Sequence, residues 1–295
     1  MKSVFKSEDG ERAVRERYLT LLKHWPVPNE QLSVPTREGE TFVVIGGPES
    51  APPLVLLHGS AATSAMWMGD IATWAAHFRV YAIDMIGEPG LSAPSRPPLE
   101  SEAHALWLDD VFMALRLTRA SLVGVSLGGW LAVDYATRRP ERAESLVLLC
   151  PGGVGRQKSG FIFKAVALRV LGPWGERKIQ ELVLGPPLAN PSPALQYFME
   201  YAALINRHFR YRTVKLPVFS DDVLKQLTMP LMAIVGGRDV LLDSADTRRR
   251  LESLVPHAEI HFLPEARHFI PSQTKPILEF LMGKAVSRQL VSHQQ

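Results

Sequence analysis

Seven short apolar runs, rich in β-branched residues, recur along the chain and predict β-strands. Most of these runs are continuous rather than alternating, as in Leu54–Leu57 and Leu146–Leu149. Continuous apolar runs are typical of strands buried on both faces, which favours a mainly parallel sheet covered by helices. The predicted strands are Thr41–Gly46, Pro53–His58, Arg79–Asp84, Ala120–Val125, Ser145–Cys150, Pro230–Val235 and Ala258–Leu263. The first of them is compatible with an antiparallel edge.

Segments with helical length and helical apolar spacing lie between the predicted strands. Pro140 ends one of them, and Pro276 stands near the first turn of the last, where a missing N–H is harmless. A strand alternating with a helix predicts a sheet built from βαβ units, hence an α/β fold. The predicted helices are Met66–His77, Glu102–Leu117, Leu127–Arg138, Ser244–Leu254 and Pro276–Lys284, preceded by an amphipathic helix at Glu11–His24.

One segment interrupts this alternation. About eighty residues separate Cys150 from Pro230, far more than the usual two to six residues of an αβ loop. Three helical patterns within it predict a helical insertion over one end of the sheet: Phe161–Leu171, Glu176–Leu184 and Ala194–Phe209. Aromatic and other large apolar side chains of this insertion are expected to roof an apolar pocket. They include Phe161, Phe163, Trp174, Tyr197, Phe198, Met199 and Tyr201.

Composition adds several exclusions. The 295 residues are 46% hydrophobic and 21% charged, which is ordinary for a globular protein and excludes a disordered chain. The single cysteine, Cys150, cannot form an internal disulfide. The first twenty residues are charged and lack an apolar signal region, and no run of eighteen apolar residues occurs. These features predict a cytoplasmic protein without a membrane span.

The charge balance does not indicate a nucleic-acid partner. The net charge is +3, although residues 151–230 carry eleven Lys and Arg against five Asp and Glu. No basic stripe with interleaved aromatic residues accompanies this excess, so nucleic-acid binding is not expected. A basic segment can favour anionic ligands, but a solvated surface is the simpler explanation and the one we adopt.

The sharpest motif is Gly124–Gly128, which reads G-V-S-L-G and is followed by Gly129. It stands between the predicted strand Ala120–Val125 and the predicted helix Leu127–Arg138. A serine at such a sharp strand-to-helix turn is a nucleophile elbow, in which only glycines fit around the serine. A glycine-rich turn that binds phosphate is the alternative, but the G-x-G-x-x-G pattern is absent.

A nucleophilic serine requires a base and an acid that orients it. Asp239 follows the strand Pro230–Val235, and His268 follows the strand Ala258–Leu263, so both leave carboxyl ends of predicted parallel strands. Asp243 and Asp246 compete for the role of the acid, but they fall near or inside the next helix. His257 and His261 lie before or within a strand and are expected to be structural.

Another short motif, His58-Gly59-Ser60-Ala61, follows the strand Pro53–His58 directly. A glycine turn at this position can aim backbone N–H groups at a reacting carbonyl oxygen. The N–H groups of Ser60 and Leu127 therefore form the candidate oxyanion hole. We interpret His58 as a structural histidine that holds the turn, because His268 fits the chain order Ser, Asp, His.

These motifs together resemble the α/β-hydrolase superfamily over roughly residues 35–285, and further matching segments favour its bacterial carboxylesterases. Asp84 with Gly87, Gly90 and Ser92, and the segment Arg139–Ala143, match the superfamily. The segments that favour the bacterial carboxylesterases are the N-terminal helix, Trp25–Pro28 and Asp84–Glu88. The resemblance implies residues 1–34 as an N-terminal helix and lead-in, 35–150 and 230–288 as the core, and 151–229 as a helical cap. One departure stands out: the family's D-x-x-G-x-G-x-S spacing is one residue longer here, which leaves open whether this loop contacts substrate.

We therefore expect a serine hydrolase of small-molecule carboxylic esters, with Ser126 as nucleophile, His268 as base and Asp239 as acid. The serine excludes relatives that need an aspartate nucleophile, and Cys150 lacks an elbow. No metal-ligand spacing or cofactor motif is visible, so neither a metal nor a cofactor is expected. The same triad also serves C–C hydrolases, thioesterases, aminopeptidases and perhydrolases, and a non-catalytic receptor is a further alternative. The oligomeric state is not readable from the sequence.

Overall fold

The computed structural model describes residues 3–158, 160–186, 190–212 and 214–292, and these residues form one eight-stranded sheet in the order β1-β2-β4-β3-β5-β6-β7-β8. The strands from β4 to β8 run parallel, while β2 is antiparallel to both of its neighbours. This arrangement confirms the predicted α/β fold. The strands are β1 Asn29–Val34, β2 Thr41–Gly46, β3 Pro53–Leu57, β4 Arg79–Ile83, β5 Ala120–Val125, β6 Ala143–Leu149, β7 Leu231–Gly236 and β8 Glu259–Leu263.

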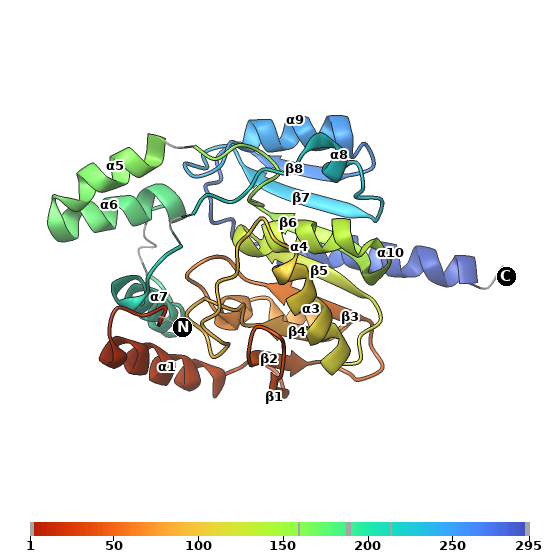
Figure 1. Cartoon of the computed structure of the whole chain (residues 1–295), viewed down its shortest axis with the longest axis horizontal. Helices are drawn as coiled ribbons and strands as arrows, with labels where there is room; N and C mark the ends of the chain where they lie inside the picture. The colour runs from red at the N-terminus through yellow and green to blue at the C-terminus, as the bar shows by residue number, and fades with distance from the viewer. Residues whose placement is uncertain (1–2, 159, 187–189, 213, 293–295) are drawn as a thin grey trace.

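Helices cover both faces of this sheet (Figure 1). The α-helices are α1 Glu8–Leu22, α2 Ile71–Trp74, α3 Ala103–Ala114, α4 Leu127–Arg138, α5 Gly160–Arg169, α6 Gly172–Leu184, α7 Pro193–His208, α8 Asp221–Leu224, α9 Ser244–Leu254 and α10 Thr274–Ser292, and the 3-10 turns are η1 Ser64–Trp67 and η2 Pro140–Arg142. Among the described residues, no helix has both the length and the apolar character needed to cross a membrane.

The continuous apolar strands serve two separate cores. In β3, Val55 and Leu57 belong to the cluster that contains Trp107, whereas Leu54 and Leu56 belong to the cluster on the opposite face. Since successive side chains of a strand point to opposite faces, every position of a fully covered strand must be apolar. The sequence pattern is explained by this double coverage.

The strand predicted at the antiparallel edge of the sheet is not the edge strand in the structure. Thr41–Gly46 is antiparallel, but it lies inside the sheet and all six of its residues are buried. The edge is β1, Asn29–Val34, in which only Val34 is buried. Because its other side chains face solvent at least in part, this strand carries no apolar run, and sequence patterning missed it.

The predicted helix Met66–His77 is wrong as a single element. The structure has the 3-10 turn η1 and the short helix α2 instead. Met68, Gly69 and Asp70 separate the two, and Gly69 and Asp70 disfavour a helix interior. The predicted boundaries of the longer helices differ from the observed ones mostly by a few residues.

The long segment after β6 contains α5, α6 and α7, as predicted. Figure 1 shows α5 and α6 side by side at one end of the molecule, and these two helices contact each other. Helix α7 packs instead on α1, where the rings of Tyr18 and Tyr201 stack with centroids 5.8 Å apart. The segment is thus attached to the rest of the fold at more than one place.

Candidate active site

Ser126 lies at the junction of β5 and α4 in a backbone conformation that side chains rarely adopt. Its φ is 52° and its ψ is −107°, within the left-handed half of the map. Its N–H donates to the carbonyl of Leu149 at 2.9 Å, and its carbonyl accepts from Gly152 at 3.0 Å. A strained turn held by its neighbours is the local geometry that the motif predicted.

Two glycines of the motif are required by close backbone approach. A Cβ on Gly124 would lie 2.5 Å from the carbonyl oxygen of Gly128. A Cβ on Gly128 would lie 2.2 Å from the carbonyl oxygen of Leu57, at the end of β3. A side chain at either position would push α4 away from the sheet, so these glycines let the helix begin directly behind Ser126.

Asp239 and His268 form a hydrogen-bonded pair. The Nδ1 of His268 lies 2.7 Å from Oδ2 of Asp239. The other carboxylate oxygen, Oδ1, accepts from the N–H groups of Leu241 and Leu242 at 2.7 and 3.0 Å. Burial alone would raise the pKa of Asp239, but the hydrogen bond and charge of His268, together with these N–H groups, hold that pKa below its usual value.

The pair and Ser126 lie at the same edge of the sheet. The N–H of Ser126 donates to the carbonyl of Leu149, the residue before Cys150. The Sγ of Cys150 lies within 4.8 Å of a carboxylate oxygen of Asp239 and a ring nitrogen of His268. The three predicted residues therefore follow the carboxyl ends of β5, β7 and β8, which open on the same edge of the sheet. The assignment of Ser126, Asp239 and His268 as a catalytic triad stays a prediction.

The competing residues have structural partners. Asp243 is the N-cap of α9, where its side chain accepts from the N–H of Asp246 at 3.1 Å. Asp246 accepts from the N–H of Arg156 at 3.0 Å. His257 contacts the carbonyl of Met229, and the ring of His261 contacts Glu259. These contacts engage all four side chains away from the Asp239–His268 pair.

His58 holds two loops together, as predicted. Its Nε2 accepts a hydrogen bond from the N–H of Met85 at 2.9 Å, and its Nδ1 donates to the carbonyl of Gly59 at 2.8 Å. Both ring nitrogens are engaged, and burial lowers the pKa of this imidazole. A neutral, fully bonded ring suits a structural role.

The candidate oxyanion donors lie on two different loops. Leu127 is the first residue of α4. Ser60 follows Gly59, at which a Cβ would lie 3.8 Å from the Cβ of Ser126. The turn after β3 therefore runs beside the serine. The role of the Ser60 and Leu127 N–H groups stays a prediction.

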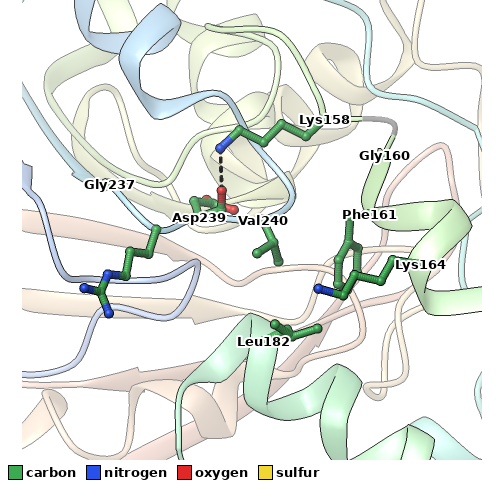
Figure 2. A pocket seen from close by; sticks show the side chains of 9 residues that line it. Lys158, Gly160, Phe161, Lys164, Leu182, Gly237, Asp239 and Val240 are labelled. Atoms are coloured by element: carbon green, nitrogen blue, oxygen red, sulfur yellow. Dashed lines mark hydrogen bonds between the residues drawn. The ribbon is translucent and has the colours of Figure 1, made fainter. Parts of the chain in front are cut away.

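A pocket of about 380 Å³ lies between the α5–α6 pair and the loop that carries Asp239 (Figure 2). Phe161 from α5 and Leu182 from α6 supply apolar walls, opposite Val240. Lys158 also lines it, and its ammonium donates to the carbonyl of Asp239 at 2.7 Å. Sequence reasoning named Phe161 and Asp239 but missed Lys158, Lys164 and Leu182, because no motif marks which helix face meets this loop.

Two of the aromatic residues that were expected in the roof face solvent instead. Phe163 is 77% exposed and Trp174 is 54% exposed. Tyr201 is buried against Tyr18 and donates its hydroxyl to Thr63 at 3.3 Å, so it anchors α7. The expectation that the aromatic side chains of this segment roof the pocket was therefore wrong for Phe163, Trp174 and Tyr201.

Cys150, Asp239 and His268 also form a potential metal cluster, the one such group within the described ranges. Burial raises the pKa of the Cys150 thiol, which keeps it protonated and makes it a poor ligand and a poor nucleophile. Asp239 and His268 already bond to each other. The donor set therefore does not fit a metal ion.

The chain belongs to the α/β-hydrolase family, whose model matches residues 54–280. Within it, the chain is similar to carboxylesterase YbfK of Bacillus subtilis, at 31% identity over 91% of this chain and 93% of the relative. It is equally similar to the uncharacterized carboxylesterase nap of the same species, at 31% identity over 86% of each protein.

Solved structures give the same result. The crystal structure of the Bacillus subtilis carboxylesterase CesB (YbfK) matches with a TM-score of 0.80 at 30% identity, over 93% of this chain and 99% of that one. The naproxen esterase structure from the same species matches with a TM-score of 0.75 at 26% identity, over 98% of this chain and 100% of that one. The chain is thus a carboxylesterase-like member of the family.

Proposed function

We propose that this protein is a serine hydrolase that cleaves small-molecule carboxylic esters through an acyl-enzyme intermediate. The observation that carries the proposal is the strained Ser126 turn at the same sheet edge as the Asp239–His268 pair. The carboxylesterase names of its relatives support the ester bond as the target.

In this mechanism Ser126 attacks the ester carbonyl while His268 takes its proton through Nε2. Asp239 holds the imidazole by Nδ1 and stabilises the positive charge that develops on the ring. The N–H groups of Ser60 and Leu127 bind the oxyanion of the tetrahedral intermediate. His268 then gives the proton to the leaving alcohol, and a water molecule repeats the cycle on the acyl-enzyme.

The proposal also includes a division of the chain. Residues 151–229 would form a cap, and residues 35–150 and 230–288 the hydrolase core. The pocket between α5, α6 and the Asp239 loop would bind part of the ester. Three cations, Lys158, Lys164 and Arg238, line it, and they disfavour substrates with a free amine. An aminopeptidase that uses Ser126, Asp239 and His268 is therefore the weaker alternative.

An ester panel tests the proposal. The purified chain should hydrolyse p-nitrophenyl acetate and butyrate, and a fluorophosphonate should label Ser126 stoichiometrically. Peptide mapping of the labelled protein identifies the modified residue. Labelling at another serine, or no turnover across the panel, would contradict the assignment.

A further inference from the structure

Glu88 is a buried carboxylate that the proposed mechanism does not use. Its side chain is only 1% exposed. Its Oε2 accepts a hydrogen bond from the backbone N–H of Ala61 at 2.7 Å and lies 3.4 Å from the Oγ of Ser60. A carboxylate is costly to bury without partners, and Glu88 finds two of its partners in the turn of Ser60 and Ala61.

The contact acts on the peptide that follows the candidate oxyanion donor. Ala61 has a φ of 55°, in the left-handed region that residues with a side chain rarely adopt. A hydrogen bond from its N–H to Glu88 fixes the plane of the Ser60–Ala61 peptide. The orientation of the preceding Ser60 N–H depends on this backbone turn, because no regular strand or helix holds it.

The loop that carries Glu88 contacts the turn at two further points. The N–H of Met85 donates to Nε2 of His58 at 2.9 Å. Asp84 accepts from the N–H of Ser64 at 2.8 Å. Glu88 lies between Gly87 and Gly90, in the loop that is one residue longer than the family spacing. The contact of Glu88 with Ala61 thus lies between the contacts at His58 and Ser64.

A cation holds the other side of the carboxylate. The Nε of Arg212 lies 3.4 Å from Oε1 of Glu88, and the two side chains are 11% and 0% exposed. Arg212 follows α7, and its guanidinium also donates to the carbonyl of Ile86 at 3.4 Å. The chain after α7 is therefore connected through Glu88 to the turn beside Ser126.

We propose that Glu88 is a positioning residue that sets the direction of the Ser60 N–H, and that Arg212 keeps the Glu88 carboxylate in place. The inference rests on the proposed function, because Glu88 acts through the oxyanion hole and neither touches the substrate nor transfers a proton.

Two variants test the inference, Glu88→Gln and Glu88→Ala. Loss of one oxyanion donor costs about 10²–10³ in kcat, and a misdirected donor should cost part of that. We expect kcat per active site to fall about tenfold in Glu88→Gln and about a hundredfold in Glu88→Ala. KM should change less than threefold, since the ground-state carbonyl gains little from the oxyanion hole. Arg212→Met should give a smaller loss of kcat.

The measurement must separate positioning from folding. End-point labelling with excess fluorophosphonate counts the competent sites, and kcat is divided by that count. Inhibition by an alkylboronic acid, which forms a tetrahedral adduct, should weaken in proportion to the loss of kcat/KM. A purely structural role would reduce the labelled fraction and the Tm, while kcat per labelled site stayed at the wild-type value.

Asp110→Asn is the matched control. Asp110 likewise accepts a backbone N–H, that of Arg37 at 2.8 Å, and pairs with the same residue's guanidinium at 2.8 Å. It lies on α3, and its variant should lower the Tm without changing kcat per labelled site. A wild-type kcat per labelled site in both Glu88 variants would overturn this inference but leave the proposed function standing. A wild-type chain that neither hydrolyses esters nor is labelled would overturn the proposed function, and the inference with it.

Discussion

His268 and Asp239 come from loops that follow adjacent strands, β8 and β7, and their side chains meet at 2.7 Å between Nδ1 and Oδ2. The carboxylate is fully buried, while the imidazole is 13% exposed. Since Asp239 engages Nδ1, the other ring nitrogen is left to receive a proton. In the proposed mechanism the two tasks of the ring are thus separated, orientation at Nδ1 and proton transfer at Nε2.

The first prediction follows from this pair. In Asp239→Asn, the amide can stabilise the wrong tautomer of His268, and turnover should fall by about 10⁴, the loss known for the same change in a serine protease. The kcat for p-nitrophenyl butyrate measures this effect.

Asp243→Asn is the comparison variant, because Asp243 caps α9 instead. Asparagine is also a good N-cap, so both the kcat and the Tm should stay near their wild-type values. A larger loss of kcat in Asp243→Asn than in Asp239→Asn would transfer the role of the acid to Asp243.

The second prediction concerns the nucleophile. Ser126→Ala should abolish ester turnover and fluorophosphonate labelling while leaving the circular dichroism spectrum unchanged, because the hydroxyl makes no described structural contact. Ser145→Ala is the control, since that buried hydroxyl bonds only to Ser121 at 2.9 Å among the described contacts. The control should keep both turnover and labelling. Retained labelling in Ser126→Ala would refute the assignment.

The third prediction concerns chain length. Each methylene that the pocket buries should contribute about 0.8 kcal/mol, roughly fourfold in kcat/KM, until the pocket is full. Phe161→Ala or Leu182→Ala should move the cutoff of an acyl or alkyl series to longer chains, because both side chains line the pocket. The pH profile of kcat should stay unchanged.

Phe163→Ala provides the comparison for the pocket variants. Phe163 is on the same helix but is 77% exposed. Its variant should leave the chain-length profile where it is. If the profile moves in Phe163→Ala and not in Phe161→Ala, the pocket beside Asp239 does not select the substrate.

The fourth prediction concerns acid stability. Burial, reinforced by the charge of Arg212, lowers the pKa of His104 from 6.5 to about 4. The unfolded chain therefore takes up a proton between these pH values and the folded chain does not. The free energy of unfolding should fall by up to about 3 kcal/mol as the pH drops from 6.5 to 4.

Urea unfolding at pH 7 and pH 4.5 measures this loss. His104→Phe keeps a ring against Trp130 and removes the titrating group, so it should show a shallower pH dependence than the wild type. His24→Gln, an exposed position, should keep the wild-type slope. Equal slopes in all three proteins would refute the role of His104.

The sequence predicted the fold because its signals are local and strong. Double burial requires continuous apolar strands such as Leu54–Leu57, and the sharp turn at Ser126 requires glycines at 124 and 128. The edge strand β1 was missed because it is largely exposed, and strand prediction relied on apolar runs.

The surroundings of the site were harder to predict. Glu88 lies in a segment that matched the family pattern, but no motif gave its side chain a role, and its partner Arg212 lies more than one hundred residues away. The pocket depends on the rotation of α5, which places Phe161 inward and Phe163 outward. Helix rotation is set by tertiary packing, and apolar spacing alone cannot fix it when most positions are apolar.

The stacked pair Tyr18–Tyr201 has a consequence for how such enzymes can diversify. It fastens α7 to α1, and the hydroxyl of Tyr18 donates to Asp84 at 2.8 Å, which in turn holds the N–H groups of Ser64 and Leu91. Helices α5 and α6 pack on each other instead. Helix α6 meets the loop of His268 through Arg267, which donates to the carbonyls of Glu181 and Leu182. Those contacts use backbone carbonyls, so side chains on α5 and α6 can vary with the ligand while α7 stays fastened to α1 by the tyrosine stack.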